Sequence, residues 1–118
     1  MTDGREHRKL HELQSELEAF FHNEVVDERL EGLSLTGIEL SSDRKHLTLR
    51  YLPVEGRDES AQEGLQHILA LVRERAREVL FRAPEIRFKL DRGAQNRQRV
   101  ERILRELADE QEHEQERD

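Results

Sequence analysis

The chain has 118 residues, of which 34% are hydrophobic and 40% are charged, so we expect one domain with a small core under a heavily charged surface. The absence of cysteine excludes disulfides, thiolate catalysis and cysteine-ligated zinc, and an aromatic content of 4% argues against broad base-stacking platforms. The N-terminal segment has no apolar signal-like stretch and no apolar run approaches the length of a membrane span, which predicts a soluble, cytoplasmic protein without membrane contact.

The formal net charge of −7 is distributed unevenly along the chain. Residues 73–105 carry 11 Lys and Arg against 5 Asp and Glu, whereas residues 1–72 carry 8 against 15 and residues 106–118 carry 1 against 7. The overall acidity argues against nonspecific coating of nucleic acid. A local phosphate-binding surface stays open, because exposed charges separated by more than about 10 Å are largely screened at cellular salt.

The first half of the chain predicts a helix followed by a β-hairpin. Residues 5–26 carry apolar residues at helical spacing, namely Leu10, Leu13, Leu17, Phe20 and Phe21. Residues 33–40 and 45–52 alternate as strands, and their separation by a short polar turn favours antiparallel pairing. The alternation of the first strand changes phase at Thr36-Gly37, which predicts a β-bulge there.

The second half predicts one long helix, a strand and a final helix. The stripe Leu65, Ile68, Leu69, Val72, Ala76, Val79 and Leu80 favours a helix of about six turns. Ser60 and Glu63 fit a capping box at its start, and Pro84 ends it. Residues 85–90 alternate as a strand, and the narrow stripe Val100, Ile103, Leu104 and Leu107 predicts the last helix.

The element order helix–strand–strand–helix–strand–helix predicts a two-layer α+β domain, with a three-stranded sheet and helices on one face. We expect this domain to span residues 5–107 and the acidic residues 108–118 to fray into solvent. Leu49 and Phe88 belong to the predicted core.

The residues that carry enzyme or metal chemistry do not form a recognisable site in the sequence. His7 and His11 have the i,i+4 spacing of two metal ligands on a helix, but no third ligand follows at a useful spacing, so we interpret them as solvated surface residues. The chain has no nucleophile elbow and no glycine-rich phosphate loop. We therefore expect no enzyme activity, no cofactor and no bound metal.

The basic block is the strongest functional feature of the sequence. Arg73 and Arg77 share a face of the predicted helix, and Arg87 and Lys89 point outward from the strand that follows. Arg82 and Arg92 flank the two ends of that strand. Cations held on rigid elements suit recognition of an RNA backbone by shape. The alternative is that the helical arginines pair with Glu74 and Glu78 on a solvated surface.

Four stretches in order resemble the ribosome-binding factor A family of bacterial small-subunit assembly factors, over roughly residues 8–107. Val26-Asp27-Glu28-Arg29-Leu30 resembles the family's Asp-Pro-Arg-Leu segment, and residues 35–43 resemble its first strand and turn. Ala83-Pro84-Glu85-Ile86-Arg87-Phe88 resembles its Val-Pro-Glu-Leu-x-Phe motif. Gly93 and the apolar helix after it fit its C-terminal element.

The resemblance implies a type II KH-like fold and a non-catalytic factor that binds the maturing small ribosomal subunit and its rRNA. It also implies a role in rRNA end maturation and in adaptation to cold, and we expect a monomer when the protein is free. The family's Ala-x-Gly kink corresponds to Ile68-Leu69-Ala70, so we expect one straighter helix or a kink moved toward Gly64. The alternative function is a KH-like protein-interaction module that has lost RNA binding.

Overall fold

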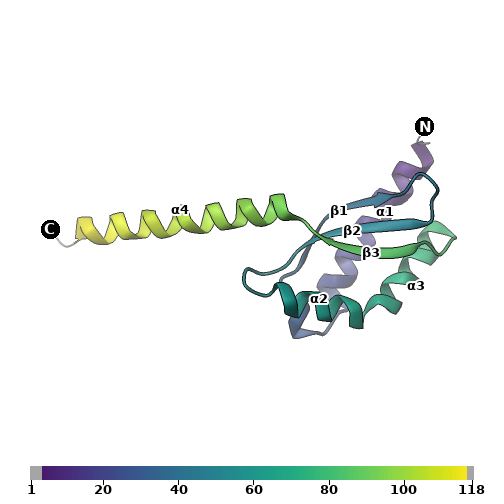
Figure 1. The fold of residues 1–118 in the computed structure, drawn as a ribbon, viewed down its shortest axis with the longest axis horizontal. Helices are drawn as coiled ribbons and strands as arrows, with labels where there is room; N and C mark the ends of the chain where they lie inside the picture. The colour runs from purple at the N-terminus through teal and green to yellow at the C-terminus, as the bar shows by residue number, and fades with distance from the viewer. Residues whose placement is uncertain (1–3, 117–118) are drawn as a thin grey trace.

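The computed structural model describes residues 4–116 and contains a three-stranded sheet with α1, α2 and α3 on one face, while α4 extends away from the domain (Figure 1). The elements are α1 (Gly4–Asn23), the short 3-10 helix η1 (Glu28–Leu30), β1 (Ser34–Leu40), β2 (His46–Leu52), α2 (Asp58–His67), α3 (Leu69–Leu80), β3 (Glu85–Leu90) and α4 (Arg92–Glu116). The predicted α+β class and the positions of the three strands are confirmed. No helix within residues 4–116 has the length and apolar character needed to cross a membrane.

The sheet has the order β1-β2-β3, with β2 antiparallel to β1 and parallel to β3. The antiparallel pair confirms the predicted hairpin, and the pairing register shifts between Leu35 and Gly37, which confirms the predicted bulge. Because the bulge adds one residue, Leu35 and Ile38 both turn toward the helices despite their odd spacing. The parallel β2–β3 pair requires a crossover, and α2 and α3 supply it.

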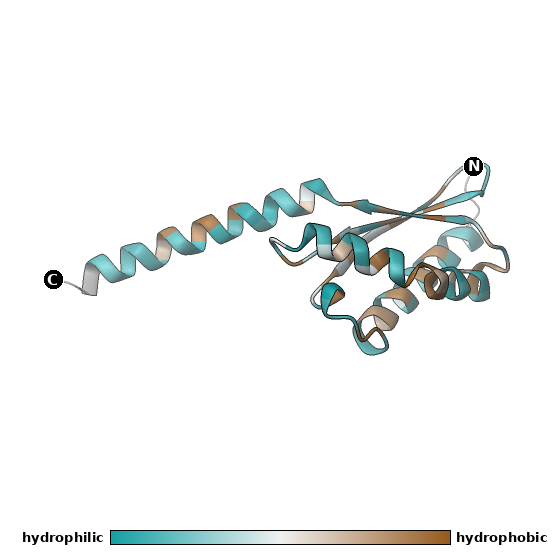
Figure 2. Ribbon diagram, turned by 60° about the horizontal axis from the view of Figure 1, so that its bottom comes forward, coloured by the Kyte–Doolittle hydropathy of each residue, from teal (hydrophilic) through white to brown (hydrophobic). Residues whose placement is uncertain are grey.

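The core lies between the inner sheet face and the three helices. Leu47, Leu49 and Tyr51 of β2 are buried together with Ile86 of β3, and Phe88 packs half-buried beside them. The helices contribute buried aliphatic residues along one side each, including Leu13, Leu17, Leu65 and Val72. Figure 2 shows the resulting alternation of hydrophobic and hydrophilic positions along the strands and around the helices.

The prediction of one long helix is wrong, because the chain breaks at Ile68 between α2 and α3. Ile68 has φ −99° and ψ 7°, and its side chain is only 5% exposed. Neither a straighter helix nor a kink at Gly64 is present. The two helices have different supports, since α2 packs on η1 and α3 packs on α1. The packing of α2 on η1 and of α3 on α1 therefore decides where the helix breaks. The helix propensity of the residues at the break opposes this by about 1 kcal/mol at most for each residue, which is too little to keep one straight helix.

The predicted capping box is also wrong, because α2 begins at Asp58, two residues before Ser60. Arg57 occupies the N-cap position without a side-chain cap hydrogen bond, and its guanidinium donates to the carbonyl of Glu28 at 3.1 Å. Asp58 accepts a 2.8 Å hydrogen bond from the side-chain amide of Gln95. Tertiary partners thus fix the start of α2, and the acidic first turn complements the helix dipole.

The base of α4 is tied to the domain while the rest of the helix projects outward. Asp91 accepts a 3.0 Å hydrogen bond from the backbone N–H of Ala94, and Arg102 pairs with Glu55 at 2.8 Å. In the structure α4 continues through residues 108–116. The division into a domain at 5–107 and a tail at 108–118 stays a prediction.

Candidate nucleic-acid interface

The sheet face opposite the helices carries a compact set of cations. Strand alternation points Arg50 of β2 and Arg87 and Lys89 of β3 away from the core, and the register places Arg50 directly beside Lys89. Adjacent strands lie about 4.8 Å apart, so like charges at paired positions repel each other. We call Arg50, Arg87 and Lys89 the sheet cation cluster. A bound polyanion would relieve the electrostatic repulsion among these three side chains.

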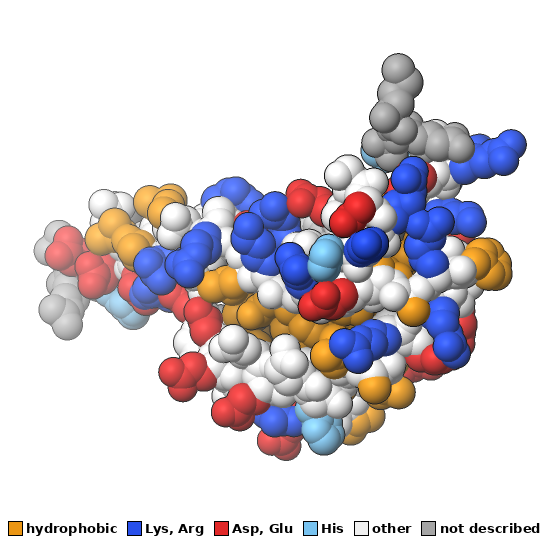
Figure 3. All heavy atoms as spheres, turned by 45° about the vertical axis from the view of Figure 1, so that its right-hand side comes forward, with side chains coloured by type: hydrophobic (Ala, Val, Ile, Leu, Met, Phe, Trp, Pro, Cys, Tyr) orange, Lys and Arg blue, Asp and Glu red, His pale blue; other side chains and the backbone are white. Residues whose placement is uncertain are grey.

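The acidic residues of this face neutralise the cluster only in part. Arg50 forms an ion pair of 3.2 Å with Glu39, and His46 lies 3.3 Å from the carboxylate of Glu85. Among the described residues, Arg87 and Lys89 form no ion pair and both are exposed. Lys and Arg side chains predominate over the upper half of Figure 3, and acidic side chains lie mainly below them. The outer sheet face therefore carries more Lys and Arg side chains than acidic partners for them, within an acidic chain.

The two predicted arginines of α3 lie on the same side of the molecule as β3. Arg75 pairs with Glu24 of the α1–η1 connection at 2.7 Å, which identifies the α1 side of α3. At about 100° per residue, Arg73 and Arg77 point roughly 160° away from Arg75. Because α1 contacts β1 and α3 contacts β3, that opposite side is the side of the edge strand β3. Both arginines are exposed there.

The remaining predicted cations lie at the two ends of β3. Arg82 is exposed in the α3–β3 connection, and Arg92 is the exposed first residue of α4. The six predicted residues are therefore distributed along β3 and its neighbour α3 rather than gathered in one pocket. The alternative interpretation holds at Arg77, whose guanidinium pairs with Glu74 at 3.0 Å.

Arg50 is the residue that the sequence-based prediction of the site missed. Its outward direction was already visible from the alternation of residues 45–52. Its proximity to Lys89 was not visible, because the parallel pairing of β2 with β3 and its register come from the tertiary structure. Arg44, in the β1–β2 turn, is also exposed but is paired with Glu6 at 2.8 Å.

The segment around Asp27 has a structural role. Its carboxylate accepts hydrogen bonds from the backbone N–H of Arg29 at 3.0 Å and from the Arg29 guanidinium at 3.0 and 2.8 Å. These bonds lower the pKa of Asp27 from 3.8 to about 2. The Asp-x-Arg-Leu pattern thus closes η1 and buries Leu30 under α2, which explains why these residue types occur in this order.

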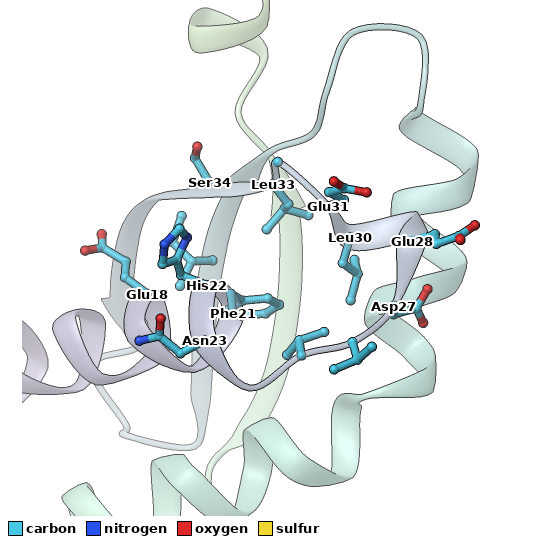
Figure 4. Close-up of a pocket in the computed structure, with 14 residues that line it drawn as sticks. Glu18, Phe21, His22, Asn23, Asp27, Glu28, Leu30, Glu31, Leu33 and Ser34 are labelled. Carbon is cyan, nitrogen blue, oxygen red and sulfur yellow. The ribbon is translucent and has the colours of Figure 1, made fainter.

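A hollow of about 970 Å³ lies beyond the C-terminal end of α1, between this helix and η1 (Figure 4). Its lining includes Phe21 and Leu33, and the carboxylates of Glu18, Glu28 and Glu31 stand around its rim. Carboxylates repel phosphate, so this hollow is unsuited to an RNA backbone. Within residues 4–116 no three potential metal ligands come together, and His7 and His11 are both exposed on α1.

Comparisons with known proteins agree with this architecture. The family described as "Ribosome-binding factor A" matches residues 5–104. The ribosome-binding factor A of Lacticaseibacillus casei is 32% identical over 104 residues, covering 81% of this chain and 86% of the relative. The protein of the same name from Thermomicrobium roseum is 31% identical over 115 residues, covering 93% of this chain and 88% of the relative.

Among solved structures, the crystal structure of ribosome-binding factor A from Thermus thermophilus superposes with a TM-score of 0.53 at 20% identity. The match covers 70% of this chain and 87% of that protein, and it shows a common KH-like α+β fold. The family match over residues 5–104 and the 32% identity to a member show more than a common fold, because they concern the sequence itself. The chain belongs to the ribosome-binding factor A family.

Proposed function

We propose that this protein binds the maturing small ribosomal subunit through its rRNA, without catalysis, and assists the maturation of the rRNA ends. The family supports an association with the ribosome. The observation that carries the RNA contact is the sheet cation cluster, because Arg50, Arg87 and Lys89 share an uncovered face that only partly finds acidic partners. A role in ribosome assembly would place the protein in the cytoplasm and would contribute to adaptation to cold.

The sheet is a suitable scaffold for phosphate recognition. Main-chain hydrogen bonds fix the strands, so the cations are held at a set spacing before RNA arrives, and little ordering entropy is lost on binding. Contacts to phosphate and ribose read the shape of an RNA helix rather than its sequence. We expect Arg73, Arg77, Arg82 and Arg92 to extend this contact along the β3 side of the domain, and one copy to bind each subunit.

Co-sedimentation with purified small subunits tests the proposal. We expect the parent protein to sediment with the subunit at low salt and to be released as salt rises. The double variant Arg87→Glu/Lys89→Glu should bind at least tenfold more weakly, because it reverses two charges of the cluster. A matched control, Arg8→Glu/Arg105→Glu, makes the same change in net charge at exposed positions away from β3 and should bind like the parent.

Absence of co-sedimentation of the parent at low salt would exclude small-subunit binding. Equal losses in both double variants would show that net charge, rather than the cluster, governs the interaction.

A second candidate is a KH-like protein-interaction module that no longer binds RNA. The observation in its favour is the acidic hollow, on whose edge Val26 is 99% exposed. This candidate predicts no salt-dependent affinity for rRNA, and it predicts a protein partner on the subunit, whose binding survives Arg87→Glu/Lys89→Glu. The same sedimentation series therefore separates the two functions.

A further inference from the structure

The outer part of α4 carries an apolar stripe that no described part of the domain covers. Val100, Ile103, Leu104 and Leu107 are 54%, 43%, 59% and 51% exposed. They form the brown band midway along α4 in Figure 2, beyond the two-layer domain. Isolated exposed apolar residues are ordinary, but four at i, i+3, i+4 and i+7 form a continuous helix face suited to packing against another helix.

The direction of the stripe excludes packing against the chain's own domain. The side of α4 that faces the domain is identified by Gln95, which bonds Asp58, and by Arg102, which pairs with Glu55. At about 100° per residue, the centre of the stripe lies roughly 140° around the helix from these residues. A partner must therefore approach α4 from the side opposite the domain.

The polar residues on the stripe side change character from one end of α4 to the other. The same angular step places Asn96 and Arg97 on this side before the stripe, and Glu110 and Gln111 on it after the stripe. Across the whole helix, the segment before the stripe is basic and the segment after it is acidic. A helix with this polarity is complementary to a copy of itself that runs in the opposite direction.

We propose that α4 is a self-association surface, on which a second copy of the chain packs its own α4 antiparallel about a two-fold axis between Ile103 and Leu104. In this register Val100 meets Leu107 of the partner, and Ile103 meets the partner's Leu104. Arg97 lies opposite Glu110 of the partner, and each of these pairings occurs twice because the interface is isologous. A parallel arrangement would bring Arg97 against Arg97 and Glu110 against Glu110, which is unfavourable.

The size of the surface sets the strength of the dimer. Two helix faces with four large apolar residues each bury less than about 1,200 Å², the range of weak, reversible complexes. The dimer therefore forms at high protein concentration, which departs from the expectation of a free monomer. The two domains lie at opposite ends of the helix pair, so both sheet faces stay open, and the inference does not depend on the proposed RNA binding.

Sedimentation equilibrium of the full chain, from about 10 µM to about 1 mM, tests the association directly. The average mass should rise from the monomer value of 14.0 kDa toward twice that value. Leu104→Glu places a charge in the centre of the stripe and should hold the chain at the monomer mass. Arg105→Glu lies on the opposite side of the same helix and should dimerise like the parent. A monomer mass for the parent at about 1 mM would overturn the proposal.

Charge reversal tests the antiparallel direction. Arg97→Glu alone and Glu110→Arg alone each turn two attractive pairs into repulsive ones, and each should dimerise about tenfold more weakly than the parent. An equimolar mixture of the two variants restores both pairs in a heterodimer and should regain the parent's association. A mixture no better than either variant alone would overturn the antiparallel arrangement, whatever the outcome for RNA binding.

Discussion

Gly64 lies where α2 approaches η1 most closely, and its missing side chain makes that approach possible. A Cβ atom at this position would stand 2.8 Å from Cγ of Leu30, 3.0 Å from its Cδ2 and 3.2 Å from Cβ of Arg29. Leu30 is only 5% exposed, so its branched carbon has little room to move. The glycine therefore serves close packing rather than a kink in the helix.

Gly64→Ala is expected to destabilise the fold by about 1–3 kcal/mol, because overpacking exceeds the gain of about 1 kcal/mol in helix propensity. Urea unfolding followed by circular dichroism measures the difference. Gly93→Ala is the matched control, since its Cβ would meet its nearest neighbours at an ordinary 3.5 Å. A Gly64→Ala protein as stable as the parent would contradict the packing of α2 on Leu30.

Asp27 makes stability depend on pH in the acid range. Its pKa is lowered to about 2 in the folded chain, from 3.8. The stabilisation is therefore fully present above about pH 4 and is lost as the pH falls toward 2 and the carboxylate gains a proton. Asp27→Asn should show a smaller loss of stability than the parent between pH 4 and 2, measured by thermal melts. Parallel curves for the two proteins would remove Asp27 as the cause.

At the scale of elements, local patterns predicted the hairpin and its bulge correctly, because the alternation of side chains and the position of Gly37 are properties of the strand itself. The long helix was predicted wrongly for the opposite reason. Its apolar stripe is continuous in sequence, yet its two halves pack on different supports, η1 for α2 and α1 for α3. The break at Ile68 follows from those supports, and it falls at the triplet Ile68-Leu69-Ala70 that corresponds to the family's kink, although this triplet has no glycine.

The central strand β2 is expected to be the most sensitive element. Leu49 is completely buried between Ile38 on β1 and Phe88 on β3, so Leu49→Ala should cost about 2–5 kcal/mol by leaving a cavity. Phe88→Ala should cost less within that range, since Phe88 is half-buried at the sheet edge. Chemical unfolding gives both values. A Leu49→Ala protein with unchanged stability would contradict its position in the core.

At the scale of the whole molecule, charge is separated in space as well as in sequence. The sheet cation cluster lies on one face, the acidic hollow lies at the end of α1, and the acidic half of α4 projects away from both (Figure 1). Exposed charges of opposite sign at such separations are screened at cellular salt. The net charge of −7 is therefore compatible with a local site for a polyanion.

The salt dependence of rRNA binding should report the number of phosphate contacts. Each contact contributes about −0.7 to −0.9 to the slope of log affinity against log salt. Arg87→Gln should reduce the slope by about that amount, and Arg50→Gln should do the same, whereas Arg75→Gln should leave it unchanged because Arg75 is bound to Glu24. Filter binding of an rRNA fragment over a salt series measures these slopes. Equal slopes for all three variants would remove the sheet face as the contact surface.

The sequence by itself determined the α+β class, the strands, the bulge and the outward direction of Arg87 and Lys89, because side-chain periodicity and glycine placement act within one element. Only the tertiary structure decided the break at Ile68 and the start of α2 at Asp58. It also decided the β2–β3 register that places Arg50 beside Lys89. These depend on which elements meet, and segments far apart in the chain make those contacts. The stripe of α4 was also visible in the sequence, but only the structure shows that it points away from its own domain.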